Sequence, residues 1–93
     1  MKKNKAVFHD LGFSEKESVS ITLKSDLHLK ILDVIERQKT TPRELEKILN
    51  VPQPRISELL NGKISTLSIE KLISYLEKLG VITSVNFKYR RAD

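Results

Sequence analysis

Polar side chains gather in the stretch VPQPRISELLNGK, residues 51 to 63. Glutamine can pair bidentately with adenine, arginine can pair with guanine or a phosphate, serine can contact either, and proline can lie against a thymine methyl group. If the apolar positions of this stretch pack inward, the side chains left outside could therefore contact the edges of DNA bases. The expected base contacts are Gln53, Pro54, Arg55, Ser57 and Glu58. The alternative is an ordinary solvent-exposed helix surface, which would suffice for an isolated Gln-x-Arg-x-Ser sequence.

The residues on either side of the expected base contacts suit contacts with the phosphate backbone of DNA. Such contacts position a protein on the duplex without specifying its sequence. The expected backbone contacts are Thr41, Arg43, Asn61 and Lys63.

Two short helices must hold these side chains. In TPRE, Thr41 is placed as the N-cap, Pro42 at the first helical position and Glu44 three residues later, which forms a capping box. The helix with Leu45, Ile48 and Leu49 on its inner face should end near Asn50, a residue that tolerates a left-handed backbone.

A second helix should follow after a turn of about three residues. Ile56, Leu59 and Leu60 mark its apolar face, and Gly62 marks its end. Two helices of about eight residues joined by a short turn form a helix-turn-helix unit. This context favours base reading over the plain surface interpretation. The prolines are also explained simply as residues that start helices.

Helices are also expected on both sides of this unit. Ser14 and Glu17 have capping-box spacing, but the β-branched and serine-rich residues 18 to 24 suggest a break or a poor turn. A stronger helix should run from Leu27 to about Gln38. Ser68 is expected to cap a last helix through Leu79, with Gly80 as its stop. The inner faces of these two helices are expected to hold Leu27, Ile31, Val34, Ile35, Ile69, Leu72, Ile73, Leu76 and Leu79.

The apolar period changes to two in VITSVNFKY, residues 81 to 89, which predicts one C-terminal β-strand. No second strand is found in the sequence, so we expect this strand to pair with its own copy in a homodimer. The expected dimer interface is Val81, Val85, Phe87 and Tyr89. The alternative is that the strand folds back on the last helix of its own chain.

Composition fits a mainly α fold of four to five short helices plus this strand. The 93 residues predict a single domain, 1–93, with residues 1–14 as an N-terminal arm. The chain has no cysteine, no apolar leader and no long apolar run, so we expect a soluble cytoplasmic protein without a membrane partner. A net charge of +5 suits a polyanionic partner.

Nothing in the sequence favours catalysis, so we expect no enzyme, catalytic residue, cofactor or metal. His9 and His28 lie far apart in the sequence without a surrounding motif, and both are expected at the surface. The carboxylates neighbour lysines at helical spacing and are typical of a solvated face. RNA binding is disfavoured because exposed aromatic residues for base stacking are few.

The stretch TTPRELEKILNVPQPRISELLNGKI resembles the helix-turn-helix of XRE-type regulators, which include Cro and phage repressors. The flanks AVFHDLGFSEKES and LSIEKLISYLEKLGVITSVNFK resemble the HigA-like antitoxin branch, and the similarity covers residues 6 to 88. The residues that match the family pattern are Thr41, Glu44, Leu49, Val51, Gln53, Pro54, Ile56, Ser57, Leu59, Gly62 and Lys63.

Four residues depart from the family pattern. Pro42 replaces a glutamine that often touches the DNA backbone, and Glu46 replaces a small residue where the two helices pack closely. Asn50 replaces the glycine of the turn. Pro52 replaces a serine cap, so its helix should lack a side-chain cap worth about 1 kcal/mol.

The resemblance implies a sequence-specific regulator that binds double-stranded operator DNA as a repressor. It also implies a RelE/HigB-type toxin partner that the chain would neutralise. The expected toxin contact is Phe8, Leu11 and Phe13, with core packing under the first helix as the alternative. A phage-type repressor without a toxin, or a neutraliser that binds only protein, are the other functions open at this point.

Overall fold

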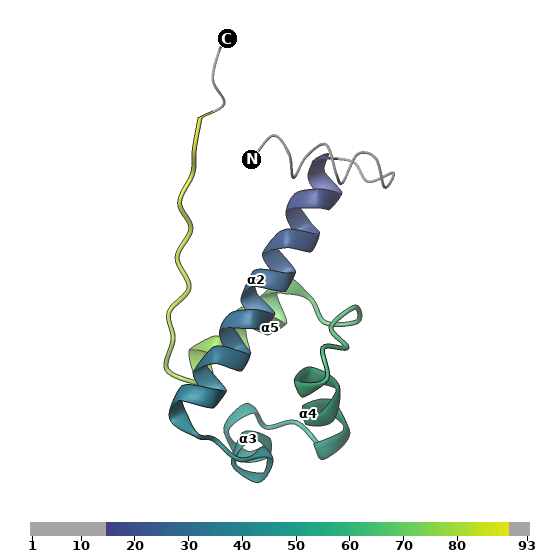
Figure 1. Cartoon of the computed structure of the whole chain (residues 1–93), viewed down its shortest axis with the longest axis vertical. Coiled ribbons are helices and arrows are strands. Elements are labelled where there is room, and N and C mark those ends of the chain that lie inside the picture. Colours follow the sequence, from purple (N-terminus) through teal and green to yellow (C-terminus); the bar gives the residue numbers. More distant parts are fainter. Residues whose placement is uncertain (1–14, 90–93) are drawn as a thin grey trace.

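The computed structural model describes residues 15–89, and within this range the only regular elements are helices. They are α2 (Glu15–Gln38), α3 (Pro42–Leu49), α4 (Gln53–Leu60) and α5 (Ile69–Lys78). The long helix α2 packs most extensively against α5, while α3 contacts both α4 and α5 (Figure 1). Among the described residues, none of the helices has the length and apolar content that crossing a membrane would require.

Helix α2 continues without a break from Glu15 to Gln38, so the break predicted in residues 18 to 24 is wrong. Each β-branched residue destabilises a helix by only about 0.5 kcal/mol relative to alanine. A break would instead leave several backbone groups without helical partners. The N-terminal half of α2 extends beyond the other helices (Figure 1). Ser14 of the predicted capping box lies outside the described residues.

The predicted starts and stops of the shorter helices are confirmed. The Thr41 hydroxyl accepts from the Glu44 amide at 3.2 Å, and the Thr41 amide donates to the Glu44 carboxylate at 2.8 Å. Ser68 caps α5 by accepting from the Lys71 amide at 3.0 Å. Helix α5 ends at Lys78, and Gly80 just beyond its C-cap Leu79 has φ 91°, a conformation that favours glycine. Local sequence therefore decides where these helices begin and end.

The core is aliphatic, as composition predicts, except for one tyrosine, and one isoleucine differs from expectation. Tyr75 is 3% exposed and joins the core, and Ile48 is 39% exposed although its spacing placed it on the inner face of α3. Ile35, Leu60, Ile69 and Ile73 are only partly buried around the core. The buried core consists of Leu27, Ile31, Val34, Leu45, Leu49, Ile56, Leu59, Leu72, Tyr75, Leu76 and Leu79.

Side chains from other helices satisfy the carbonyl groups at the ends of the three short helices. Lys78 donates to the Leu49 carbonyl at 3.2 Å, at the end of α3. Gln38 donates to the Leu79 carbonyl at 3.1 Å, just after α5. The last carbonyls of a helix have no partner within it, so these bonds fix the helices relative to one another.

His28 provides the third of these bonds, and its expected place at the surface is wrong. The residue is buried, and its Nε2–H donates to the Leu59 carbonyl at 2.7 Å, near the end of α4. A carbonyl oxygen can only accept, so the ring proton lies on Nε2. His28 therefore connects the long helix to α4. His9 lies outside the described residues.

We expect His28→Ala to lower the free energy of unfolding by about 1–3 kcal/mol, because a buried acceptor loses its donor and a cavity remains. The measurement is urea unfolding followed by circular dichroism. Leu29→Ala is the matched control, since Leu29 is the next residue of α2 and is 61% exposed. An equal small effect of both variants would contradict a structural role for this bond.

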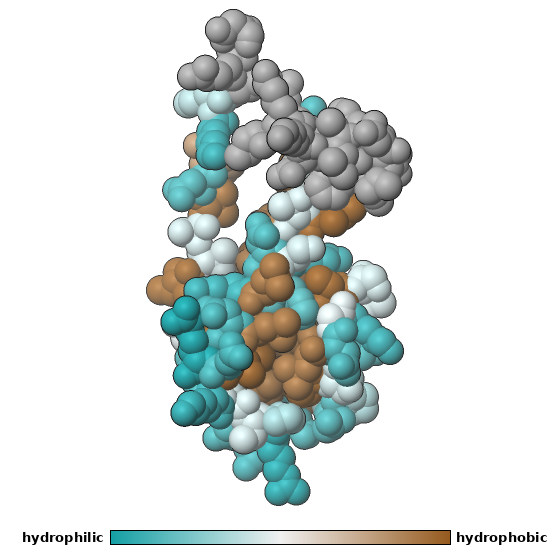
Figure 2. Space-filling model, in the orientation of Figure 1, coloured by the Kyte–Doolittle hydropathy of each residue, from teal (hydrophilic) through white to brown (hydrophobic). Residues whose placement is uncertain are grey.

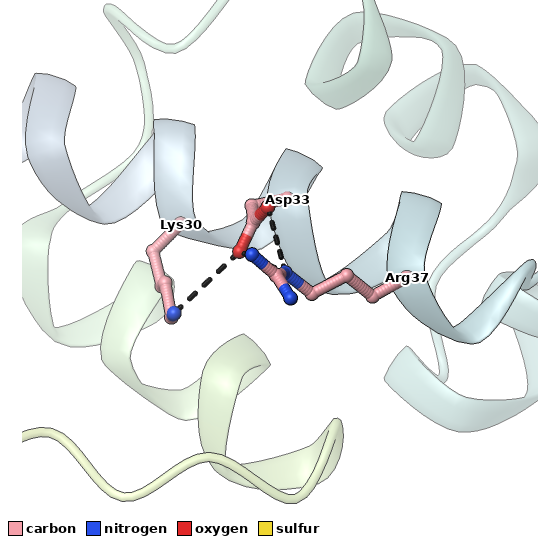
Figure 3. A network of polar contacts seen from close by, with 3 residues as sticks. All are labelled: Lys30, Asp33 and Arg37. Atoms are coloured by element: carbon pink, nitrogen blue, oxygen red, sulfur yellow. Dashed lines mark hydrogen bonds and ion pairs between the residues drawn. The ribbon is translucent and has the colours of Figure 1, made fainter.

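One polar network lies on the surface of α2. Asp33 accepts from Arg37 at 2.9 Å and pairs with Lys30 at 3.5 Å (Figure 3). The hydrogen bond from Arg37 lowers the pKa of the Asp33 carboxyl below its ordinary value. Ion pairs of this spacing support the helix that carries them, and exposed ones contribute little to global stability.

Residues 81–89 run as an extended segment that pairs with no strand in the described part of the chain (Figure 1). The predicted strand is therefore not formed among the described residues. Val81 and Thr83 are partly buried, whereas Val85 is 65%, Phe87 92% and Tyr89 101% exposed. Beyond Thr83 this segment is not packed on α5, contrary to the fold-back alternative. Apolar and hydrophilic residues alternate along it at the left of Figure 2.

Candidate nucleic-acid interface

The turn between α3 and α4 is built by three residues with different roles. Asn50 has φ 57° and ψ 49°, the left-handed conformation expected for it at the end of α3. Val51 is partly buried against the core. Pro52 is the N-cap of α4 and provides no side-chain cap, as its replacement of serine predicted. The two helices are joined as a helix-turn-helix unit, with α3 packed against α4.

The two prolines at the start of α4 reduce the number of amide groups that need partners. Neither Pro52 nor Pro54 has an N–H, and the Arg55 amide already donates to the Pro52 carbonyl at 2.9 Å. The Gln53 amide has no hydrogen-bond partner among the described residues. The first turn of α4 therefore needs no protein cap and leaves this amide accessible to a DNA phosphate.

The exposed face of α4 follows from the helical rotation of about 100° per residue. Ile56 and Leu59 point into the core, so Pro54 and Glu58 lie on the opposite side, and both are exposed. Gln53 and Arg55 flank this line and are also exposed. These four side chains form the reading face of α4.

Ser57 differs from the other expected base contacts. It is partly buried, and its hydroxyl accepts from the Asn61 amide nitrogen at 3.3 Å. The same nitrogen donates to the Ser57 carbonyl at 2.8 Å. The side-chain amide of Asn61 thus donates within the end of α4, and only its carbonyl oxygen is left over. Because this oxygen and the phosphate oxygens are all acceptors, they cannot form a hydrogen bond with one another. A contact between Asn61 and a DNA phosphate would require a different rotamer.

The other expected backbone contacts are exposed at the two ends of the unit. Thr41 and Arg43 lie at the start of α3, and Lys63 follows α4. The capping hydrogen bonds from Thr41 lower the pKa of Glu44 below its ordinary value of 4.5. This cap therefore stabilises the fold above the ordinary carboxyl pKa and is lost as the pH falls through the lowered value. The exposure of these positions at the ends of the two helices follows from local helix spacing, and their contact with DNA stays a prediction.

Two hollows lie beside α4, and the sequence predicted neither. One, of about 650 Å³, separates the N-terminal half of α2 from the segment after α4 and includes Lys24, Glu58 and Lys63. The other, of about 400 Å³, lies between the start of α4 and the start of α5. Hydrophilic side chains surround an apolar centre on the face shown in Figure 2. The hollows bring together residues that are more than ten positions apart in the sequence.

Glu46 shows how the chain accommodates its largest departure from the regulator pattern. The residue is only partly buried on α3, next to the buried Leu45. A carboxylate is too costly to bury without a partner, so partial exposure keeps it solvated while the stem covers apolar surface. The helix-turn-helix geometry is therefore retained with a glutamate at this position.

Comparison with protein families supports this geometry. The model of a helix-turn-helix domain family matches residues 7–88 of the chain. The match covers most of the 93 residues, and the chain belongs to this helix-turn-helix family. No curated protein and no solved structure matched the chain. Helix-turn-helix domains are DNA-binding modules of regulators, in which the second helix of the unit enters the major groove.

Proposed function

We propose that this protein is a sequence-specific regulator that binds double-stranded DNA with α4 in the major groove. The observation that carries the proposal is the reading face of α4, which is exposed and begins at an uncapped helix start. The base readers are Gln53, Pro54 and Glu58. Gln53 pairs with adenine, Pro54 contacts a thymine methyl group, and Glu58 accepts a hydrogen bond from the amino group of cytosine. Ser57 joins them only if its bond to Asn61 opens.

Contacts at both ends of the unit hold the reading helix in register. Thr41, Arg43 and Lys63 lie where phosphates of the two groove walls would pass, and they provide affinity without sequence preference. In this proposal residues 1–93 act as one DNA-binding domain in the cytoplasm.

A homodimer forms part of the same proposal. One helix of eight residues makes few base contacts, whereas a two-fold dimer presents two helices to half-sites about one helical turn apart. The exposed segment 81–89 can pair antiparallel with its copy, which would satisfy its backbone and cover Val85, Phe87 and Tyr89.

We expect Gln53→Ala to relax preference at one or two base positions and to cost about 1–3 kcal/mol at the preferred site. Binding to unrelated duplexes should hardly change. The measurement is selection from a randomised duplex library, followed by affinity titration. Glu36→Ala, an exposed residue of α2, is the control. If the Gln53→Ala variant selects the same consensus as the Glu36→Ala control, α4 does not read bases through Gln53.

The finer function follows from the resemblance to HigA-like regulators. We infer that the protein represses its own operon and neutralises a RelE/HigB-type toxin, with Phe8, Leu11 and Phe13 as its contact; these three residues lie outside the described part of the chain. Footprinting the DNA upstream of its own gene, with and without the neighbouring gene product, tests both roles. A footprint without a stable complex would instead favour the repressor without a toxin, and a complex without a footprint would favour the protein-binding neutraliser.

A further inference from the structure

The hollow between the starts of α4 and α5 has a composition suited to one anion. Its cationic side chains are Arg55 from α4 and Lys71 from α5, and none of its lining residues is acidic. Thr66, Ser68 and Tyr75 add hydroxyl groups to the same lining. Two positive charges and hydrogen-bond donors without a carboxylate form an environment that attracts a phosphate group.

Tyr75 is the least accessible of these residues and has an unused polar group. The residue is 3% exposed, and its hydroxyl makes no hydrogen bond within the described part of the chain. The ammonium of Lys71 lies 5.8 Å from the centre of its ring. Burial raises the pKa of the Tyr75 phenol, and the charge of Arg55 acts in the opposite direction. The hydroxyl therefore keeps its proton at neutral pH and can donate it to an anion in the hollow.

Arg55 occupies a different position from the base readers. Relative to the line of Pro54 and Glu58 on α4, its side chain is rotated toward α5, where it lines the hollow with Lys71. Pro52, the residue that starts α4, lines the same hollow. An anion bound there would thus lie beside Gln53, Pro54 and Glu58, the proposed base readers, rather than in front of them.

We propose that Arg55, Lys71 and Tyr75 together bind one phosphodiester of the DNA, at the edge of the major groove that α4 reads. This inference rests on the proposed DNA binding and assigns Arg55 to the backbone rather than to a base. A phosphodiester fits better than a free anion because the hollow opens beside the start of the reading helix. One phosphate shared by two helices also fixes the angle at which α4 enters the groove.

The test compares Arg55→Gln, Lys71→Gln and the double variant with the wild-type protein. Each is titrated at several salt concentrations on the duplex recovered by library selection and on a scrambled duplex. Lys30→Gln is the control, because Lys30 is an exposed cation on α2 paired with Asp33. Circular dichroism verifies that the variants are folded. Tyr75→Phe removes only the hydroxyl.

We expect both single variants to weaken binding to the two duplexes by similar factors and to leave the selected consensus unchanged. The double variant should lower the salt slope by about 0.9, the value for one phosphate, rather than by about 1.8. Tyr75→Phe should weaken both duplexes several-fold without changing the slope, and Lys30→Gln should match the wild type.

Four outcomes would overturn the inference. A changed consensus for Arg55→Gln would make this residue a base reader, and a slope change near 1.8 would separate the two cations onto different phosphates. Tight binding of inorganic phosphate in calorimetry without DNA would indicate a site for a free anion. Variants that bind as well as a DNA-binding wild-type protein would overturn this inference alone. If the wild-type protein selects no duplex at all, the proposed function itself fails.

Discussion

Truncation after Gly80 is expected to yield a monomer in place of the proposed dimer and to lower the affinity for a two-half-site operator by about 10²–10⁴-fold. The magnitude is that of losing a linked second binding event. The physical reason is that Val85, Phe87 and Tyr89 are exposed in the single chain, where none of the described residues buries them. Sedimentation at micromolar concentration and operator titration measure the two effects.

A matched pair of point variants separates dimerisation from folding. Val85→Asp places a charge on the proposed paired face, and Asn86→Asp places the same charge on the neighbouring position of the opposite face. Only Val85→Asp should produce a monomer. Both variants retain the bond from the Val81 amide to the Leu76 carbonyl, which the truncation removes. A truncated protein that remains dimeric with full affinity would place the interface elsewhere, with α5 as the next surface to test.

Leu45→Ala is expected to lower the free energy of unfolding by about 2–5 kcal/mol. A domain of this length has about 5–14 kcal/mol in total, so the variant should lose a large fraction of it. Leu45 is 0% exposed at the centre of α3, where removing its side chain leaves a cavity between the helix-turn-helix unit and the rest of the core. Urea unfolding of the variant and of the wild-type protein, followed by circular dichroism, measures the difference in the free energy of unfolding.

Ile48→Ala is the control in the same helix, because Ile48 is 39% exposed. Its expected cost is below about 1.5 kcal/mol, since much of the removed surface was already in water. Equal losses in the two variants would mean that α3 is rotated relative to the described arrangement. The spacing of apolar residues alone does not separate these two positions, so the comparison tests the tertiary structure directly.

The sequence identified the parts of the site that depend on neighbouring residues. Thr41 and Glu44 form their capping box within one turn, and Asn50 adopts a left-handed conformation because its own side chain tolerates it. The reading helix could be located for the same reason. Its exposed residues follow from the apolar spacing of Ile56 and Leu59.

The predictions that failed concern interactions between segments distant in the sequence. His28 was expected at the surface, but its environment is decided by the end of α4, which lies 31 residues away at the Leu59 carbonyl. Ile48 was expected on the inner face of α3 but is 39% exposed, because the packing of the other helices decides which part of that face is covered. The pairing of residues 81 to 89 with a second copy of the chain stays a prediction, because the described residues contain no strand that could pair with them.

By itself, the sequence determined which helices form around residues 41 to 80, where they are capped and which side chains of α4 remain outside. Only the tertiary structure decided that α2 continues unbroken, that His28 holds the end of α4 and that Arg55 shares a hollow with Lys71. The physical reason is the range of the interactions involved. Caps and helical periodicity act over three or four residues, whereas burial and charge proximity depend on how the helices pack against one another.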